Sequence, residues 1–92
     1  LIAAMRDCFN PPMGAAEDGA TARLLVTFNR DRSVANTQVI AVTGAALGDT
    51  TARAAQRAVM MCAQQGRYSM LSAETFDQWR QVDVTFDPSE MF

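Results

Sequence analysis

Residues 50–65 read Thr-Thr-Ala-Arg-Ala-Ala-Gln-Arg-Ala-Val-Met-Met-Cys-Ala-Gln-Gln, the longest amphipathic segment of the chain. With about 100° of rotation per residue, its apolar side chains gather on one side of a helix, opposite the arginines and glutamines. Asp49 is placed to cap the start of this helix, and Gly66 to end it in a left-handed conformation. We therefore predict a helix that the rest of the chain packs against, buried along Ala52, Ala54, Ala55, Ala58, Val59, Met61 and Cys62.

The chain has the length and composition of one domain, residues 1–92. It contains 92 residues, of which 49% are hydrophobic and 20% charged, enough for a single modest core. No apolar run approaches the roughly 20 residues needed to span a bilayer. Because the chain begins at Leu1 without an initiator methionine, we expect an excised domain whose targeting segment lies upstream.

Charge and residue types argue against nucleic-acid binding and most catalytic roles. The formal net charge is −2, and the arginines are scattered, whereas a phosphate-binding face needs clustered basic residues. The chain has no lysine and no histidine, which excludes Schiff-base lysines, histidine-activated nucleophiles and imidazole metal ligands. The closest carboxylate pairs, Glu74 with Asp77 and Asp83 with Asp87, are interpreted as solvated charges. We expect no catalytic residue, no metal and no cofactor.

Apolar spacing and turn residues outline the first half of the chain. A short N-terminal helix is indicated by Leu1, Ile2, Met5, Cys8 and Phe9, and Asn10-Pro11-Pro12 ends it. Residues 23–28 alternate as a strand, with Leu24, Val26 and Phe28 on one face. Residues 29–33 carry turn chemistry, and a second strand follows over 37–43, whose inward face the pattern leaves open.

The second half adds a short helix and a third strand. Ser72 is expected to cap a helix over 73–80, with Leu71 and Phe76 spaced as a hydrophobic staple. Alternation then predicts a half-buried strand, ended by Pro88, whose apolar face is Val82, Val84 and Phe86. The expected fold is α+β, a three-stranded antiparallel sheet with helices packed on one face, in the order α-β-β-α-α-β.

Two cysteines, Cys8 and Cys62, lie on the apolar faces of two different predicted helices. Neither belongs to a Cys-x-x-Cys pair, which argues against redox catalysis and zinc binding. We favour a disulfide that joins the first helix to the second, with two buried free thiols as the alternative. A disulfide would imply an oxidising compartment.

An ordered set of motifs over nearly the whole chain points to a known family. It comprises Cys-Phe-Asn-Pro-Pro at 8–12, the turn at 29–33, the Ala/Arg helix ending near Cys62, Phe-Asp-Gln-Trp at 76–79 and Val-Thr-Phe-Asp-Pro at 84–88. Together these motifs resemble the C-terminal domain of TolA, in the TolA/TonB C-terminal family of Gram-negative bacteria. One departure is Arg32, which stands where an Asp-Gly turn would have glycine.

The resemblance implies a non-enzymatic, periplasmic protein-interaction domain of the Tol-Pal system in the cell envelope. Its implied partners are proteins of the TolB and Pal types, with colicins and filamentous phages using such domains as a receptor. The full-length protein would be anchored in the inner membrane, outside this fragment. Two alternatives stay open: a TonB-like domain that binds outer-membrane transporters, and a small secreted ligand-binding or inhibitor domain.

The third strand is the expected partner-binding site. Because the first two strands form a hairpin, the third must lie at an edge of a three-stranded sheet. The resemblance implies that partners add a strand there, beside Val82, Asp83, Val84, Thr85 and Phe86. The alternative is an edge that charge protects and that binds nothing. Phe76 and Trp79 are expected to anchor the short helix in the core, although a lone tryptophan near the C-terminus could instead be a partly exposed partner anchor.

Overall fold

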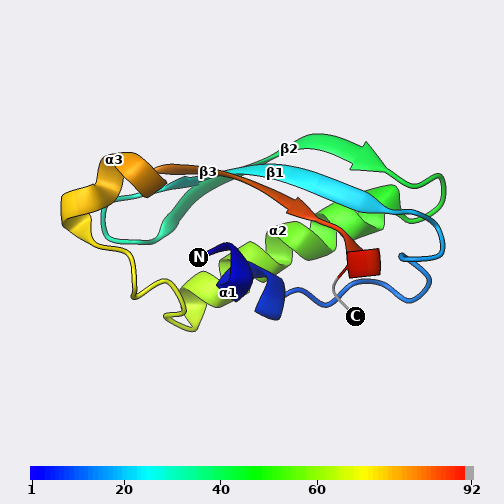
Figure 1. Cartoon of the computed structure of the whole chain (residues 1–92), viewed down its shortest axis with the longest axis horizontal. Coiled ribbons are helices and arrows are strands. Elements are labelled where there is room, and N and C mark those ends of the chain that lie inside the picture. The colour runs from blue at the N-terminus through cyan, green and yellow to red at the C-terminus, as the bar shows by residue number, and fades with distance from the viewer. Residues whose placement is uncertain (91–92) are drawn as a thin grey trace.

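The strand β1, Thr21–Phe28, is the centre of the sheet. The computed structural model describes residues 1–90 and gives the strand order β2-β1-β3, with both outer strands antiparallel to β1 (Figure 1). The hairpin partner β2 is Val34–Thr43, and β3 is Gln81–Phe86. The predicted three-stranded antiparallel sheet is therefore confirmed, and β3 lies at an edge.

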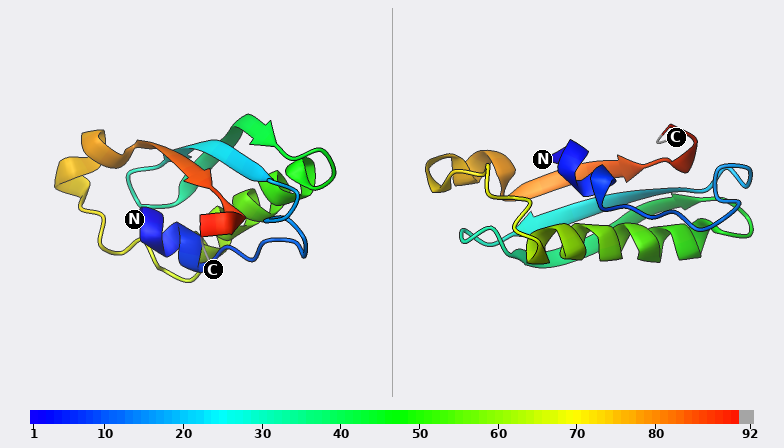
Figure 2. Two further views of the ribbon diagram at one scale, coloured as in Figure 1. Left: turned by 45° about the vertical axis from the view of Figure 1, so that its right-hand side comes forward. Right: turned by 90° about the horizontal axis from the view of Figure 1, so that it is seen from below.

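The two main helices cover a single face of this sheet (Figures 1 and 2). These are α1, Ile2–Asp7, and α2, Gly48–Gln64. A 3₁₀ turn η1, Ala73–Thr75, leads into α3, Phe76–Trp79, and a second turn η2, Pro88–Glu90, follows β3. The order α-β-β-α-α-β is as predicted. Within residues 1–90, no helix combines the length and the apolar character that crossing a membrane requires.

The helix α2 packs on the sheet through small side chains, as its sequence predicts. Its buried residues are Gly48, Thr51, Ala52, Ala55, Ala58, Val59 and Cys62. Because alanine side chains project little from the helix, its backbone lies close to the sheet. The approach is tightest at Gly48, where an added Cβ would stand only 2.7 Å from Cγ1 of Val42. Met61, expected on the buried face, is 40% exposed because it lies at the margin of that face.

The start of α2 differs from the prediction. Asp49 does not cap the helix; it lies inside the first turn, and Leu47 occupies the N-cap position without a side-chain hydrogen bond. The carboxylate of Asp18, from the loop before β1, instead accepts the amide N–H of Leu47 at 2.9 Å. The end of the helix is as predicted, since Gly66 adopts a φ of +68°.

The turn of the β1–β2 hairpin places Arg32 in the left-handed region, with a φ of +74°. Asp31 stabilises the turn by accepting the Ser33 amide at 2.9 Å, and hydrogen bonds from the Ser33 hydroxyl and amide lower the pKa of Asp31. The guanidinium of Arg32 donates to the carbonyls of Ser69 and Leu71, both at 3.3 Å. The arginine that replaces the expected glycine thus ties the hairpin to the segment that follows α2.

The predicted helix over 73–80 forms as two shorter pieces, η1 and α3. Ser72 caps the first piece as expected, because its hydroxyl oxygen accepts the amide of Glu74 at 3.3 Å. The chain between α2 and this cap is anchored by Tyr68, which is fully buried and donates its hydroxyl to the carbonyl of Val59 at 2.8 Å.

Candidate functional site: the outer edge of β3

The edge strand β3 pairs with β1 along its whole length. The register runs from Ala22 opposite Phe86 to Thr27 opposite Gln81 without a bulge. An unbroken antiparallel register fixes which backbone groups point toward β1, because hydrogen-bonded and non-hydrogen-bonded pairs alternate along it.

The direction of each backbone group follows from one hydrogen bond at the start of the strand. The amide of Phe28 donates to the carbonyl of Arg80 at 2.8 Å, so this carbonyl points toward β1, while the Arg80 amide donates to Phe76. By alternation, the backbone groups of the even-numbered residues Val82, Val84 and Phe86 also point toward β1. Those of Gln81, Asp83 and Thr85 point away from the sheet and form its outer edge.

The side chains of β3 divide into a core face and a solvent face, as the sequence alternation predicts. Val84 and Phe86 are buried and Val82 is partly buried, whereas Gln81, Asp83 and Thr85 are exposed. Phe86 also packs on Phe9, with ring centroids 5.0 Å apart. The core face therefore holds the strand in place, and the residues with outward backbone groups also present their side chains to solvent.

Asp83 forms an ion pair with Arg23 across the solvent face. The Arg23 Nε lies 2.9 Å from Oδ1 and 3.0 Å from Oδ2 of Asp83, and Nη2 makes a further contact to Oδ2. The hydrogen bonds from Arg23 hold the pKa of Asp83 below its ordinary value, and the same interaction raises the pKa of Arg23. The Asp83 carboxylate thus has its partner on the neighbouring strand.

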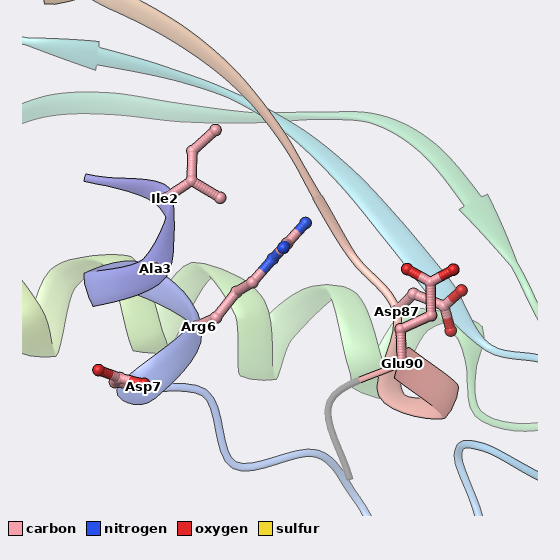
Figure 3. Close-up of a pocket in the computed structure, with 6 residues that line it drawn as sticks. All are labelled: Ile2, Ala3, Arg6, Asp7, Asp87 and Glu90. Atoms are coloured by element: carbon pink, nitrogen blue, oxygen red, sulfur yellow. The ribbon is translucent and has the colours of Figure 1, made fainter.

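Within residues 1–90, the outer edge receives one hydrogen bond from another element, donated by Arg6 of α1. Its Nη2 donates to the carbonyl of Thr85 at 3.2 Å, which agrees with an outward direction for that carbonyl. Arg6 also borders an open hollow of about 520 Å³, with Ile2, Ala3 and Asp7 on the α1 side and Asp87 and Glu90 on the other (Figure 3). This hollow lies beside the end of β3.

The two aromatic residues that were expected to be core anchors differ in burial. Trp79 is 5% exposed, and its Nε1 donates to the carbonyl of Ser72 at 2.8 Å. Its ring meets the Phe28 ring edge-on, with the ring centroids 5.9 Å apart. Phe76 is partly buried, and its ring meets the Trp79 ring edge-on with centroids 4.9 Å apart. The guanidinium carbon of Arg30 lies 4.8 Å from the centroid of the Phe76 ring. Trp79 is therefore a core residue, and Phe76 packs against the margin of the core.

Cys8 and Cys62 form the expected disulfide, with their Cα atoms 5.9 Å apart. Cys62 lies on the buried face of α2, and Cys8 directly follows α1. The bond fixes the short helix α1, and with it Arg6, to the longest helix of the domain. Among residues 1–90, no group of three metal-ligating side chains comes together.

The strand β2 forms the other edge of the sheet, and the sequence left its inward face unassigned. Pairing places Val34, Thr37, Val39 and Val42 on the helix-covered side, opposite the inward residues of β1. The register shifts twice, between Arg23 and Leu24 and between Thr27 and Phe28, which obscures the alternation. Val39 and Val42 are 37% exposed and Ile40 is 44% exposed, so β2 is an open, uncharged edge.

Comparison of this chain with family models, with curated proteins and with solved structures finds no match.

Proposed function

We propose that this chain is a non-enzymatic protein-interaction domain that takes up a strand of a partner protein at the outer edge of β3. The observation that carries the proposal is the outward direction of the backbone groups of Gln81, Asp83 and Thr85, derived from the Phe28–Arg80 hydrogen bond. A partner strand that pairs with these groups gains main-chain hydrogen bonds, and its alternate side chains meet the exposed face of β3. The buried Val84 and Phe86 keep the edge rigid while it binds.

We further propose that the domain belongs to a Tol-Pal type trans-envelope system in the periplasm. The proposed partners are proteins of the TolB and Pal types, and colicins or phage coat proteins would use the same domain as a receptor. The resemblance of the motifs supports this assignment, as does the Cys8–Cys62 disulfide, which is compatible with an extracytoplasmic location. A TonB-like role, with outer-membrane transporters as partners, is the closest alternative.

The exposed edge of β2 is a second candidate for strand addition. It is ten residues long and carries no charged side chain, whereas natural edges are commonly blunted by charge. Gln56 of α2 donates to the carbonyl of Thr37 at 3.4 Å, and three apolar side chains farther along β2 are exposed, namely Val39, Ile40 and Val42.

Backbone NMR titration tests the proposal and separates the two edges. Isotope-labelled domain is titrated with a TolB-type protein, a Pal-type protein, a transporter peptide of the kind that binds TonB, and a set of small hydrophobic ligands. We expect a TolB- or Pal-type protein to produce the largest shifts at residues 81–86. The largest shifts at 34–43 would move the site to β2. The largest shifts on the outer face of α2, around Arg53, Arg57 and Met60, would refute strand addition, and a response to the hydrophobic ligands alone would favour a ligand-binding domain.

A further inference from the structure

The side chain of Arg6 stands where a strand added to β3 would have to bind. The carbonyl of Thr85 is one of the outward acceptors of the edge, and Arg6 Nη2 donates to it at 3.2 Å. Within residues 1–90, none of the other outward backbone groups of Gln81, Asp83 and Thr85 has a hydrogen-bond partner outside the sheet. Arg6 therefore covers the C-terminal end of the edge and leaves the rest open.

Arg6 is held at this position by the anchors of α1. Met5, the preceding residue, is fully buried, and Cys8 is bonded to Cys62 two positions after Arg6. Phe9 then packs on Phe86, which is the neighbour of Thr85 in β3. The backbone of α1 is thus fixed on both sides of Arg6, and the guanidinium is delivered to the strand edge by a short, anchored helix.

The Arg6 side chain also borders the hollow beside the end of β3. Across the hollow from Arg6 lie Asp87 and Glu90, directly after β3 and in η2 (Figure 3). Among the described residues, neither carboxylate forms an ion pair, and the Asp87 carboxylate accepts hydrogen bonds only from Ser89. An arginine that leaves the Thr85 carbonyl therefore stays beside an open hollow that carboxylates line.

We infer that Arg6 is a displaceable guard of the β3 edge: it caps the Thr85 carbonyl in the free domain and must leave it when a partner strand arrives. This inference rests on the proposed strand addition at β3 and adds its regulation. The guard reduces pairing of the free edge with unrelated chains, since unpaired edges are templates for aggregation. A partner must replace the arginine's hydrogen bond with its own main-chain amide.

The test compares Arg6→Ala with Arg53→Ala, which removes the same charge from an exposed position of α2. The probe is a set of uncharged peptides selected from a random ten-residue display library on the wild-type domain and, separately, on the Arg6→Ala domain. Binding is measured by isothermal titration, and the site by backbone NMR shifts. For peptides that shift residues 81–86, we expect Arg6→Ala to lower Kd by roughly two- to tenfold, the range for one net hydrogen bond. Arg53→Ala should leave Kd unchanged.

The outcomes separate the guard from the strand-addition proposal. Peptides that bind at 81–86 only in the Arg6→Ala domain would support the guard even more strongly. Peptides that bind at 81–86 with the same Kd in both domains would overturn the guard and leave strand addition standing. If no peptide shifts residues 81–86 in either domain, strand addition at β3 is wrong and the guard is wrong with it. Melting curves check that both variants stay folded. We expect them to, because Arg6 and Arg53 are exposed.

Discussion

At the scale of single residues, Arg32 combines a backbone cost with a side-chain gain. Its φ of +74° is unfavourable for any residue with a Cβ, while its guanidinium donates to the carbonyls of Ser69 and Leu71. Arg32→Ala keeps the strained backbone and loses the hydrogen bonds. Arg32→Gly loses the same hydrogen bonds and relieves the backbone.

We therefore expect Arg32→Gly to be more stable than Arg32→Ala by about 1 kcal/mol. The free energies of unfolding of the two variants, measured in urea, give this difference directly. If Arg32→Ala proves at least as stable as Arg32→Gly, residue 32 does not adopt the left-handed conformation in solution.

Tyr68 gives a pH-dependent prediction at the same scale. Burial raises the pKa of Tyr68 to about 12, above the value of about 10 for an exposed tyrosine. Because the folded pKa is the higher one, the folded state favours the neutral phenol. Its contribution to stability is complete below pH 10 and is lost as the pH rises from about 10 to about 12.

The chain has a single tyrosine, so its ultraviolet absorbance reports this group alone. We expect the phenolate to appear near pH 12 in the native protein, or together with alkaline unfolding, and near pH 10 in urea. An ordinary midpoint near pH 10 while the domain is still folded would contradict the burial of Tyr68 and its hydrogen bond to Val59.

At the scale of elements, the contact between α2 and β2 depends on Gly48. A Cβ at this position would lie 2.7 Å from Cγ1 of Val42 and 2.8 Å from the carbonyl oxygen of Thr43. The backbone contact cannot yield by a rotamer change, so α2 would have to move away from the strand. We expect Gly48→Ala to destabilise the domain by about 1–3 kcal/mol, the cost of overpacking.

The matched control for this helix start is Asp49→Ala, one position later. Asp49 caps nothing, and its charge near the helix N-terminus is worth only about 0.3–1 kcal/mol. Chemical denaturation should rank Gly48→Ala as the more damaging of the two. An opposite order would mean that Asp49 caps the helix, as the sequence suggests.

The sequence predicts elements well where a single face repeats and poorly where distant segments meet. Val82, Val84 and Phe86 alternate so regularly that β3 and its buried face follow directly. The assignment of Asp49 as the cap fails because the true acceptor, Asp18, lies 29 positions before Leu47 in a loop without a pattern. The contact of Arg6 with Thr85 spans 79 positions, and no local signal encodes it. The inward face of β2 could not be predicted because the register of its pairing with β1 shifts twice, which interrupts the alternation of its side chains.

At the scale of the whole molecule, the disulfide is the main covalent constraint on a small core. Cys8 and Cys62 are separated by 54 positions, and closing a loop of this length removes much freedom from the unfolded chain. We expect reduction to lower the free energy of unfolding by about 3–4 kcal/mol and the melting temperature by at least about 10 °C.

Two measurements check this prediction. Thiol titration of the oxidised protein under denaturing conditions should find no free thiol, and melting curves with and without reductant should differ as stated. The double variant Cys8→Ala/Cys62→Ala should melt like the reduced protein in either buffer. Equal melting temperatures for the oxidised and reduced protein would show that the bond contributes little.

The outward amide of Thr85 allows a direct test of strand addition to β3. The amide of Thr85 points away from β1, so Thr85→Pro removes a donor from the outer edge without removing a hydrogen bond of the sheet. Thr85→Ala changes the same side chain and keeps the amide. The measurement is the affinity of both variants, with unchanged melting temperatures, for the TolB- or Pal-type protein that shifts residues 81–86. We predict that Thr85→Ala binds as the wild type does and that Thr85→Pro loses binding. Wild-type affinity in Thr85→Pro would contradict strand addition at this edge.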